Sequence, residues 1–119
     1  MLSDDLLKLI ASFLIEPKYK LLDWISEKSL STVYLSKNPN AVQLLEKRRN
    51  GIYWTWFSAN PNAIHIIEQN MNRIDWHYIS ANPNAIHIIE QNMNKIDWLY
   101  LSANPNAIHI IERNLDKID

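Results

Sequence analysis

Apolar and polar residues alternate with a helical period along the segment from 60 to 72. On a wheel of about 100° per residue, one arc is apolar and the opposite arc is polar. The apolar arc contains Ala63, Ile64, Ile66, Ile67 and Met71. The polar arc contains His65, Glu68, Gln69 and Asn72. Asn60 can cap this helix through its amide oxygen, and Pro61 suits the first turn because it has no N–H to satisfy. The pattern predicts an amphipathic α-helix of about ten residues.

A second, shorter helix is predicted after it. Asp75 is a natural N-cap, and the Asn82-Pro83 pair stops the helix after about two turns. The residues expected to pack beneath the first helix are Ile74, Trp76 and Ile79.

The connection between the two helices contains Asn70 and Asn72, and either can tolerate the left-handed conformation that closes a helix. A β-rich reading is not favoured, because repeated β-turns normally use glycine and Gly51 is the only glycine in the chain.

This helix pair recurs with a fixed period. Asn-Pro-Asn-Ala begins at Asn38, Asn60, Asn82 and Asn104, each start 22 residues after the previous one. The blocks 61–82 and 83–104 differ at three positions only. Such a period is typical of stacked units, each of which buries its apolar face against its neighbours. The predicted fold is all-α: a short α-solenoid of 22-residue helix-turn-helix repeats with an N-terminal capping helix.

The whole chain, 1–119, is interpreted as a single repeat domain. Its predicted parts are an N-terminal capping helix over 1–16, a degenerate repeat over 17–38, repeats over 39–60, 61–82 and 83–104, and a truncated terminal repeat over 105–119. Terminal units of arrays are expected to be atypical, because each has a neighbour on one side only.

The truncated repeat suggests self-association. The sequence stops at Asp119, where the other copies place the tryptophan-bearing short helix. The apolar residues expected to lose their usual cover are Ile108, Ile110, Ile111 and Leu115. Because two identical ends can close one another, the sequence predicts a two-fold homodimer through the C-terminal repeat.

Composition narrows the function classes. A net charge of −1 gives no long-range attraction for polyanions, so nucleic acid is not a favoured partner. The absence of cysteine excludes disulfides and thiolate metal sites. The start of the chain is acidic where a secretory signal needs basic residues, and no apolar run approaches the roughly 20 residues of a membrane span. An intracellular protein without membrane attachment is expected.

Histidine supplies the main candidate chemistry. His65, His87 and His109 each precede a glutamate by three residues, a spacing that places both groups on one helix face. Stacked helices lie about 8 to 10 Å apart, too far for neighbouring histidines to share a zinc ion, so no metal or cofactor is predicted. These histidines are expected to form a solvated row on a possible partner surface. That surface comprises His65, Gln69, His87, Gln91, His109 and Arg113.

The tryptophans and the remaining motifs do not point to catalysis. Trp54, Trp76 and Trp98 are interpreted as packing residues rather than platforms for bases. No nucleophile is paired with a base, and no glycine-rich phosphate loop is present. An enzyme is therefore not expected.

The run from Asn82 to Ile111 resembles the Asn-Pro-Asn-Ala-Ile repeat proteins of large DNA viruses that infect amoebae and algae, and the segment 20–25 resembles their opening segment. This resemblance implies a viral protein located in the infected host cell or in the virion. A looser likeness to leucine-rich variant repeats bears on architecture alone.

Three functions are compatible with these patterns. The first is a protein–protein interaction or structural scaffold module without catalysis. The second is an F-box-like adaptor, because residues 2–14 resemble the first F-box helix, which would recruit the host ubiquitin ligase. The third is nucleic-acid binding through the repeat surface. The first is the prediction, with a protein partner whose identity the sequence does not reveal.

Overall fold

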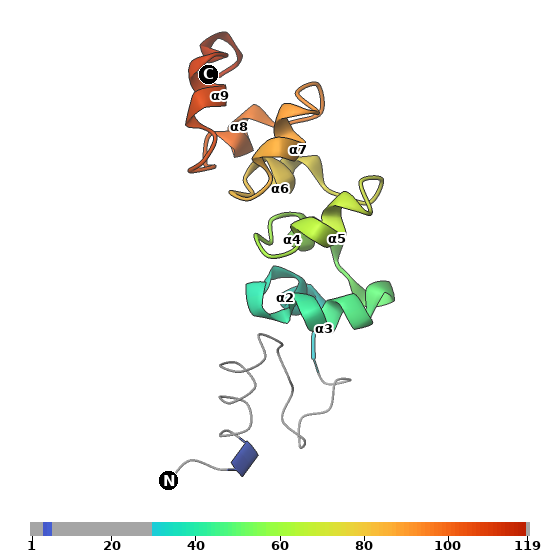
Figure 1. Ribbon diagram of the computed structural model, residues 1–119. Coiled ribbons are helices and arrows are strands. Elements are labelled where there is room, and N and C mark those ends of the chain that lie inside the picture. Colours follow the sequence, from blue (N-terminus) through green and yellow to red (C-terminus); the bar gives the residue numbers. More distant parts are fainter. Residues whose placement is uncertain (1–3, 6–29, 119) are drawn as a thin grey trace.

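A computed structural model describes residues 4–5 and 30–118 of the chain. Within 30–118 every regular element is helical and no strand is present, which confirms the all-α fold class (Figure 1). The predicted capping helix over 1–16, most of the degenerate repeat and the F-box-like segment lie outside the described residues, apart from residues 4–5.

The helices form two rows. The first row contains the short helices α2 (Thr32–Lys37), α4 (Trp54–Ser58), α6 (Trp76–Ser80) and α8 (Trp98–Leu101). The second contains α3 (Val42–Lys47), α5 (Ile64–Glu68), α7 (Ile86–Glu90) and α9 (Ile108–Glu112). Between residues 30 and 118, three 3₁₀ turns accompany them: η2 (Pro39–Ala41), η3 (Arg49–Gly51) and η4 (Leu115–Lys117). Helix α2 contacts α4, α4 contacts α6, and α6 contacts α8, so successive repeats stack upon one another (Figure 1).

The second-row helices are shorter than predicted. Helices α5, α7 and α9 have five residues each, so the expected length of about ten is wrong. The cause is the Asn-Pro-Asn-Ala segment, which forms a turn rather than the first helical turn. The Asn60 Oδ1 atom accepts a hydrogen bond from the N–H of Asn62 at 3.1 Å, and the Asn60 carbonyl accepts one from Ala63 at 3.1 Å. Helix α5 therefore begins only at Ile64.

Neither Asn70 nor Asn72 uses the left-handed conformation that an asparagine tolerates, since no described residue has a positive φ. Asn70 ends its helix with its side chain instead. Its Nδ2 donates to the carbonyl of Ile66 at 2.8 Å, and Asn92 and Asn114 make the equivalent bond in the next two repeats. Each bond satisfies a carbonyl that a helix end would otherwise leave without a partner.

The core lies between the two rows of helices. Its fully buried large side chains are Leu45, Phe57, Ile66, Ile67, Ile79, Ile89 and Leu101. Ala63, Ala85 and Ala107 precede the second-row helices and are completely buried, where a larger side chain would push the stacked repeats apart. Every described interface is thus built from the same few apolar positions.

The tryptophans pack against this core, as predicted. Trp54, Trp76 and Trp98 are half-buried and contact the apolar cluster, together with Ile74 and Ile96. In the part of the chain that the structure describes, no helix is long and apolar enough to span a bilayer.

Candidate functional site

Buried asparagines join each repeat to the one before it. The Asn82 side chain is completely buried, and its Nδ2 donates to two main-chain carbonyls of the preceding repeat, those of Ser58 at 2.9 Å and Asn60 at 3.1 Å. Asn60 and Asn104 make the same pair of bonds at their own boundaries. We call Asn60, Asn82 and Asn104 the asparagine ladder. Because every donor and acceptor is satisfied, the ladder fixes the register of the stack without leaving a buried polar group unpaired.

Buried serines make a second polar connection. The Ser58 hydroxyl donates to the carbonyl of Trp54 at 2.7 Å and accepts the N–H of Asp75 at 2.9 Å. Ser36 and Ser80 repeat this arrangement. The bond from the backbone N–H to the serine hydroxyl connects the end of one first-row helix to the start of the next. The sequence interpretation assigned Asn60 a capping role only and missed both connections, although Ser-x-Asn precedes the proline at every boundary.

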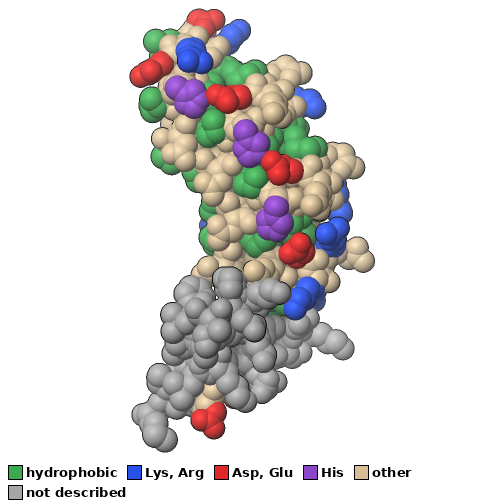
Figure 2. Space-filling model, viewed as in Figure 1, with side chains coloured by type: hydrophobic (Ala, Val, Ile, Leu, Met, Phe, Trp, Pro, Cys, Tyr) green, Lys and Arg blue, Asp and Glu red, His purple; other side chains and the backbone are tan. Residues whose placement is uncertain are grey.

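On the surface of the second-row helices, histidines pair across repeat boundaries. His87 Nε2 lies 2.5 Å from Glu68 Oε1, and His109 Nε2 lies 2.8 Å from Glu90 Oε1. His65 is 3.9 Å from Glu46. Each histidine contacts the glutamate of the preceding repeat, not the one three residues ahead in its own helix. Figure 2 shows the result as a row of alternating purple and red side chains.

The residues of the predicted partner surface remain in contact with water. His65, His87, Gln69, Gln91 and Arg113 are exposed, and His109 is half-buried. The histidine side chains are 56%, 50% and 44% exposed at positions 65, 87 and 109, so each ion pair contributes little to stability. No group of three or more potential ligands capable of holding a metal occurs among the described residues.

We expect the triple variant His65→Gln, His87→Gln, His109→Gln to fold with nearly the melting temperature of the parent protein, because solvent screens these pairs. Differential scanning fluorimetry measures this directly. The same scan with added zinc tests the metal prediction. A rise of several degrees that the triple variant abolishes would contradict it.

Four of the six exposed large apolar residues in the described part of the chain lie in or next to the first-row helices, and the other two are Ile108 and Leu115. The side chains of Leu99 and Tyr34 are 79% and 78% exposed, while Tyr53 and Val33 are 45% and 37% exposed. Exposed apolar side chains are unremarkable singly, but a group of them on one surface marks an interaction site. We call this surface the short-helix face, and it comprises Val33, Tyr34, Tyr53, Trp56, His77, Tyr78, Leu99 and Tyr100.

Aromatic rings run along this face from one repeat to the next. The ring centroids of Trp56 and Tyr78 are 5.1 Å apart, and those of Tyr78 and Tyr100 are 5.5 Å apart. The Lys37 ammonium lies 5.0 Å from the Trp56 centroid. These contacts hold the rings in fixed positions, so little side-chain entropy would be lost when a partner covers them.

A side-chain contact between His77 and Asp97 lies beside the rings. His77 Nδ1 is 2.6 Å from Asp97 Oδ2, and its ring centroid is 5.6 Å from that of Tyr100. Asp97 is the N-cap of α8 and accepts the N–H of Tyr100 at 3.1 Å. This backbone N–H, followed by the His77 contact, lowers the pKa of Asp97. The contact between His77 and Asp97 connects α6 to the N-cap of α8 at the protein surface.

The position of Tyr78 within the rings raises its pKa, through partial desolvation first and then through the neighbouring Tyr100. A raised tyrosine pKa means that the unfolded chain loses its proton first as the pH rises. We therefore expect the free energy of unfolding to fall above about pH 10, and part of that fall to be absent in Tyr78→Phe. Urea denaturation at increasing pH measures it. Tyr34→Phe is the control, and an equal change in both variants would contradict the prediction.

The four residues predicted to mediate self-association do not form one surface. Ile110 is buried and Ile111 packs against the core, whereas Ile108 and Leu115 are 58% and 67% exposed. A groove of about 500 Å³ lies nearby, but different residues line it. They are Ile96, Asp97, Trp98, Leu99, Ser102, Lys117 and Ile118.

The described architecture is that of an all-helical repeat protein. The chain matches no known family model, no curated protein and no solved structure. Its function therefore has to be inferred from its own surfaces.

Proposed function

We propose that the protein is an interaction or scaffold module, without catalysis, that binds an apolar segment of a protein partner through the short-helix face. The observation that carries this proposal is the exposure of Leu99 and Tyr34 beside the continuous rings of Trp56, Tyr78 and Tyr100. Aromatic residues held rigidly on a surface are frequent anchors of protein interfaces.

Differences among the repeats support the choice of this face. Val33, Thr55, His77 and Leu99 occupy the same repeat position but differ in size and polarity. The surface of the second-row helices instead repeats the same histidine and glutamate in three successive units. A face whose side chains change from repeat to repeat presents a distinct pattern to one partner, as specific recognition requires.

The test compares two variants in a pull-down from the cells in which the protein is naturally made. Tyr34→Ser combined with Leu99→Ser should lose the bound partner, because two exposed apolar anchors are removed. The matched control is Gln69→Ser combined with Gln91→Ser, which alters exposed residues directly after helices α5 and α7. This control should retain the bound partner. A partner that stays bound to the first variant, or that the control loses, would contradict the proposal.

The setting suggested by the viral resemblance, an infected host cell or a virion, is part of this proposal. The homodimer through the C-terminal repeat also stays a prediction. Light scattering on the purified protein measures its mass, and a monomer at micromolar concentration would contradict the dimer.

A further inference from the structure

Positive charge is concentrated along one edge of the stack. Seven of the eight lysine and arginine residues between 30 and 118 lie at the ends of the second-row helices and in the loops after them, within 47–51, 69–74, 91–96 and 113–118. These segments contain one acidic residue, Asp116. We call the cations of the first three segments the basic edge, which comprises Lys47, Arg48, Arg49, Arg73 and Lys95.

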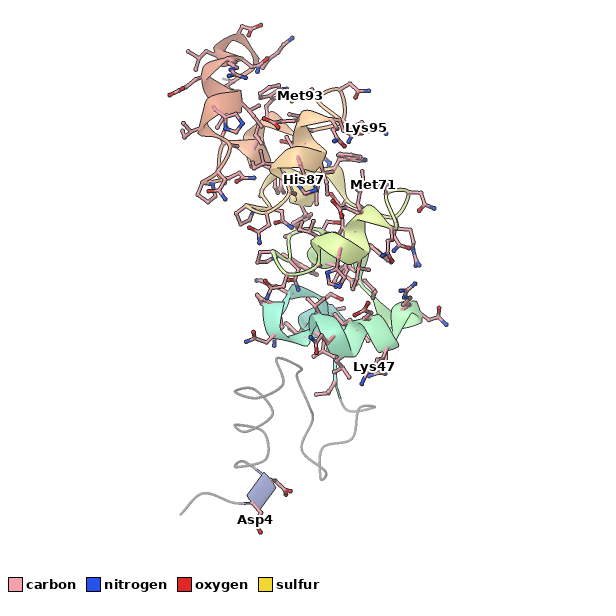
Figure 3. The ribbon with its side chains drawn as sticks, viewed as in Figure 1. Asp4, Lys47, Met71, His87, Met93 and Lys95 are labelled. Atoms are coloured by element: carbon pink, nitrogen blue, oxygen red, sulfur yellow. The ribbon has the colours of Figure 1, made fainter. Side chains whose placement is uncertain are left out.

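The fold places the first three of these segments on one side of the stack (Figure 1). The loops that follow α3, α5 and α7 project from the same side of the stack (Figure 1). Figure 3 labels Lys47, Met71 and Lys95 on that side, and Figure 2 shows blue side chains along it. The net charge of −1 for the whole chain therefore conceals a strongly cationic margin.

Two of the cations are held in equivalent positions of successive repeats. The Arg73 guanidinium carbon lies 4.8 Å from the ring centroid of Trp54, and the Lys95 ammonium lies 5.2 Å from that of Trp76. Both side chains are nevertheless exposed, so their outward faces remain accessible. Cations positioned in advance lose less conformational freedom on binding an anion.

Three carboxylates next to the basic edge are in contact with histidines. Glu46, Glu68 and Glu90 end the second-row helices just before the basic segments, but their side chains pair with the histidines of the following repeats. These contacts hold the three carboxylates in the row of purple and red side chains on the surface of the second-row helices (Figure 2).

We propose that the basic edge binds an acidic peptide segment of a protein partner. Packed helices are separated by about 8 to 10 Å, which is the expected spacing of Arg73 and Lys95. A peptide in the polyproline II conformation advances about 3.1 Å per residue with three residues per turn, so acidic residues at every third position lie on one face and match that spacing. A single-stranded nucleic acid fits less well, because it needs open rings for base stacking and the cations of this edge cover Trp54 and Trp76.

This proposal is independent of the short-helix face, because the two surfaces share no residue. The experiment is fluorescence anisotropy with a labelled 12-residue peptide that carries glutamate at every third position. A matched peptide with glutamine at those positions and a single-stranded thymidine 12-mer serve as competing ligands. We expect saturable binding of the acidic peptide, with an affinity that falls steeply as salt is raised from about 50 to 200 mM.

Two charge-removing variants and one control are compared by the same assay. Arg73→Gln combined with Lys95→Gln, and separately Lys47→Gln combined with Arg49→Gln, should each weaken binding by about tenfold or more, because each removes two positive charges from the edge. Lys37→Gln, a basic residue outside the edge, should leave the affinity unchanged. Circular dichroism verifies that each variant is folded.

Three results would overturn the proposal. They are the absence of saturable binding to the parent protein, equal affinity for the glutamate and glutamine peptides, and tighter binding of the thymidine 12-mer than of the acidic peptide. An unchanged affinity in the Lys47→Gln, Arg49→Gln variant would also overturn the proposal. This variant removes two charges from the edge and leaves the contacts of Arg73 and Lys95 with the tryptophan rings in place.

Discussion

Replacing Asn82 by alanine should destabilise the protein by about 3 kcal/mol or more, since two buried carbonyls each lose their hydrogen-bond donor. This is a large share of the stability of a small domain. Chemical denaturation followed by circular dichroism measures the change. The exposed Asn94 provides a control, and Asn94→Ala should change stability by less than about 0.5 kcal/mol.

Asn82→Asp separates the two roles of this side chain. Aspartate keeps the oxygen that accepts the N–H of Asn84 and is a good turn-capping residue, but it cannot donate to the carbonyls of Ser58 and Asn60. If the asparagine ladder dominates, aspartate should be at least as destabilising as alanine, because a buried carboxylate would face two carbonyl oxygens. A stability close to that of the parent protein would show that capping alone matters.

Trp76→Ala should destabilise the protein by about 3 kcal/mol, at the lower end of the range for tryptophan because the side chain is half-buried. The substitution removes contacts with the apolar cluster and frees the Lys95 ammonium from its position over the ring. Thermal unfolding measures the loss. Tyr34→Ala, which removes an exposed ring, should cost far less, and equal losses in the two variants would show that Trp76 is not a packing residue.

The helical fold was predictable because the apolar period recurs in near-identical units. Ile66, Ile67 and Ile79 could be assigned to the core from spacing alone, and all three are fully buried. The helix lengths could not be predicted in the same way, because Asn-Pro-Asn serves equally well as a helix start or as a closed turn. The Asn60 carbonyl accepts the N–H of Ala63 and so closes a turn before the helix begins, and sequence patterns do not show which bond forms.

The surfaces were harder to predict than the core. A helical wheel sorts polar from apolar positions within one helix, but the cover that a neighbouring repeat provides depends on how the two units stack. Leu99 lies in α8 between the packed Trp98 and the buried Leu101 and yet is 79% exposed. Likewise, net charge is a sum over the chain and carries no information on position, so the basic edge appeared only once the loops after α3, α5 and α7 were placed on one side.

The asparagine ladder also bears on how such a chain can change in length. Each Nδ2 group donates only to main-chain carbonyls of the preceding unit, and these are present whatever side chains that unit carries. If a duplicated block of 22 residues were inserted at a boundary, its ladder asparagine could donate to the main-chain carbonyls of the block before it. The block that now follows the insert could donate to the equivalent carbonyls of the insert. Growth by whole units therefore leaves every junction satisfied, while side chains on the exposed faces are free to diverge.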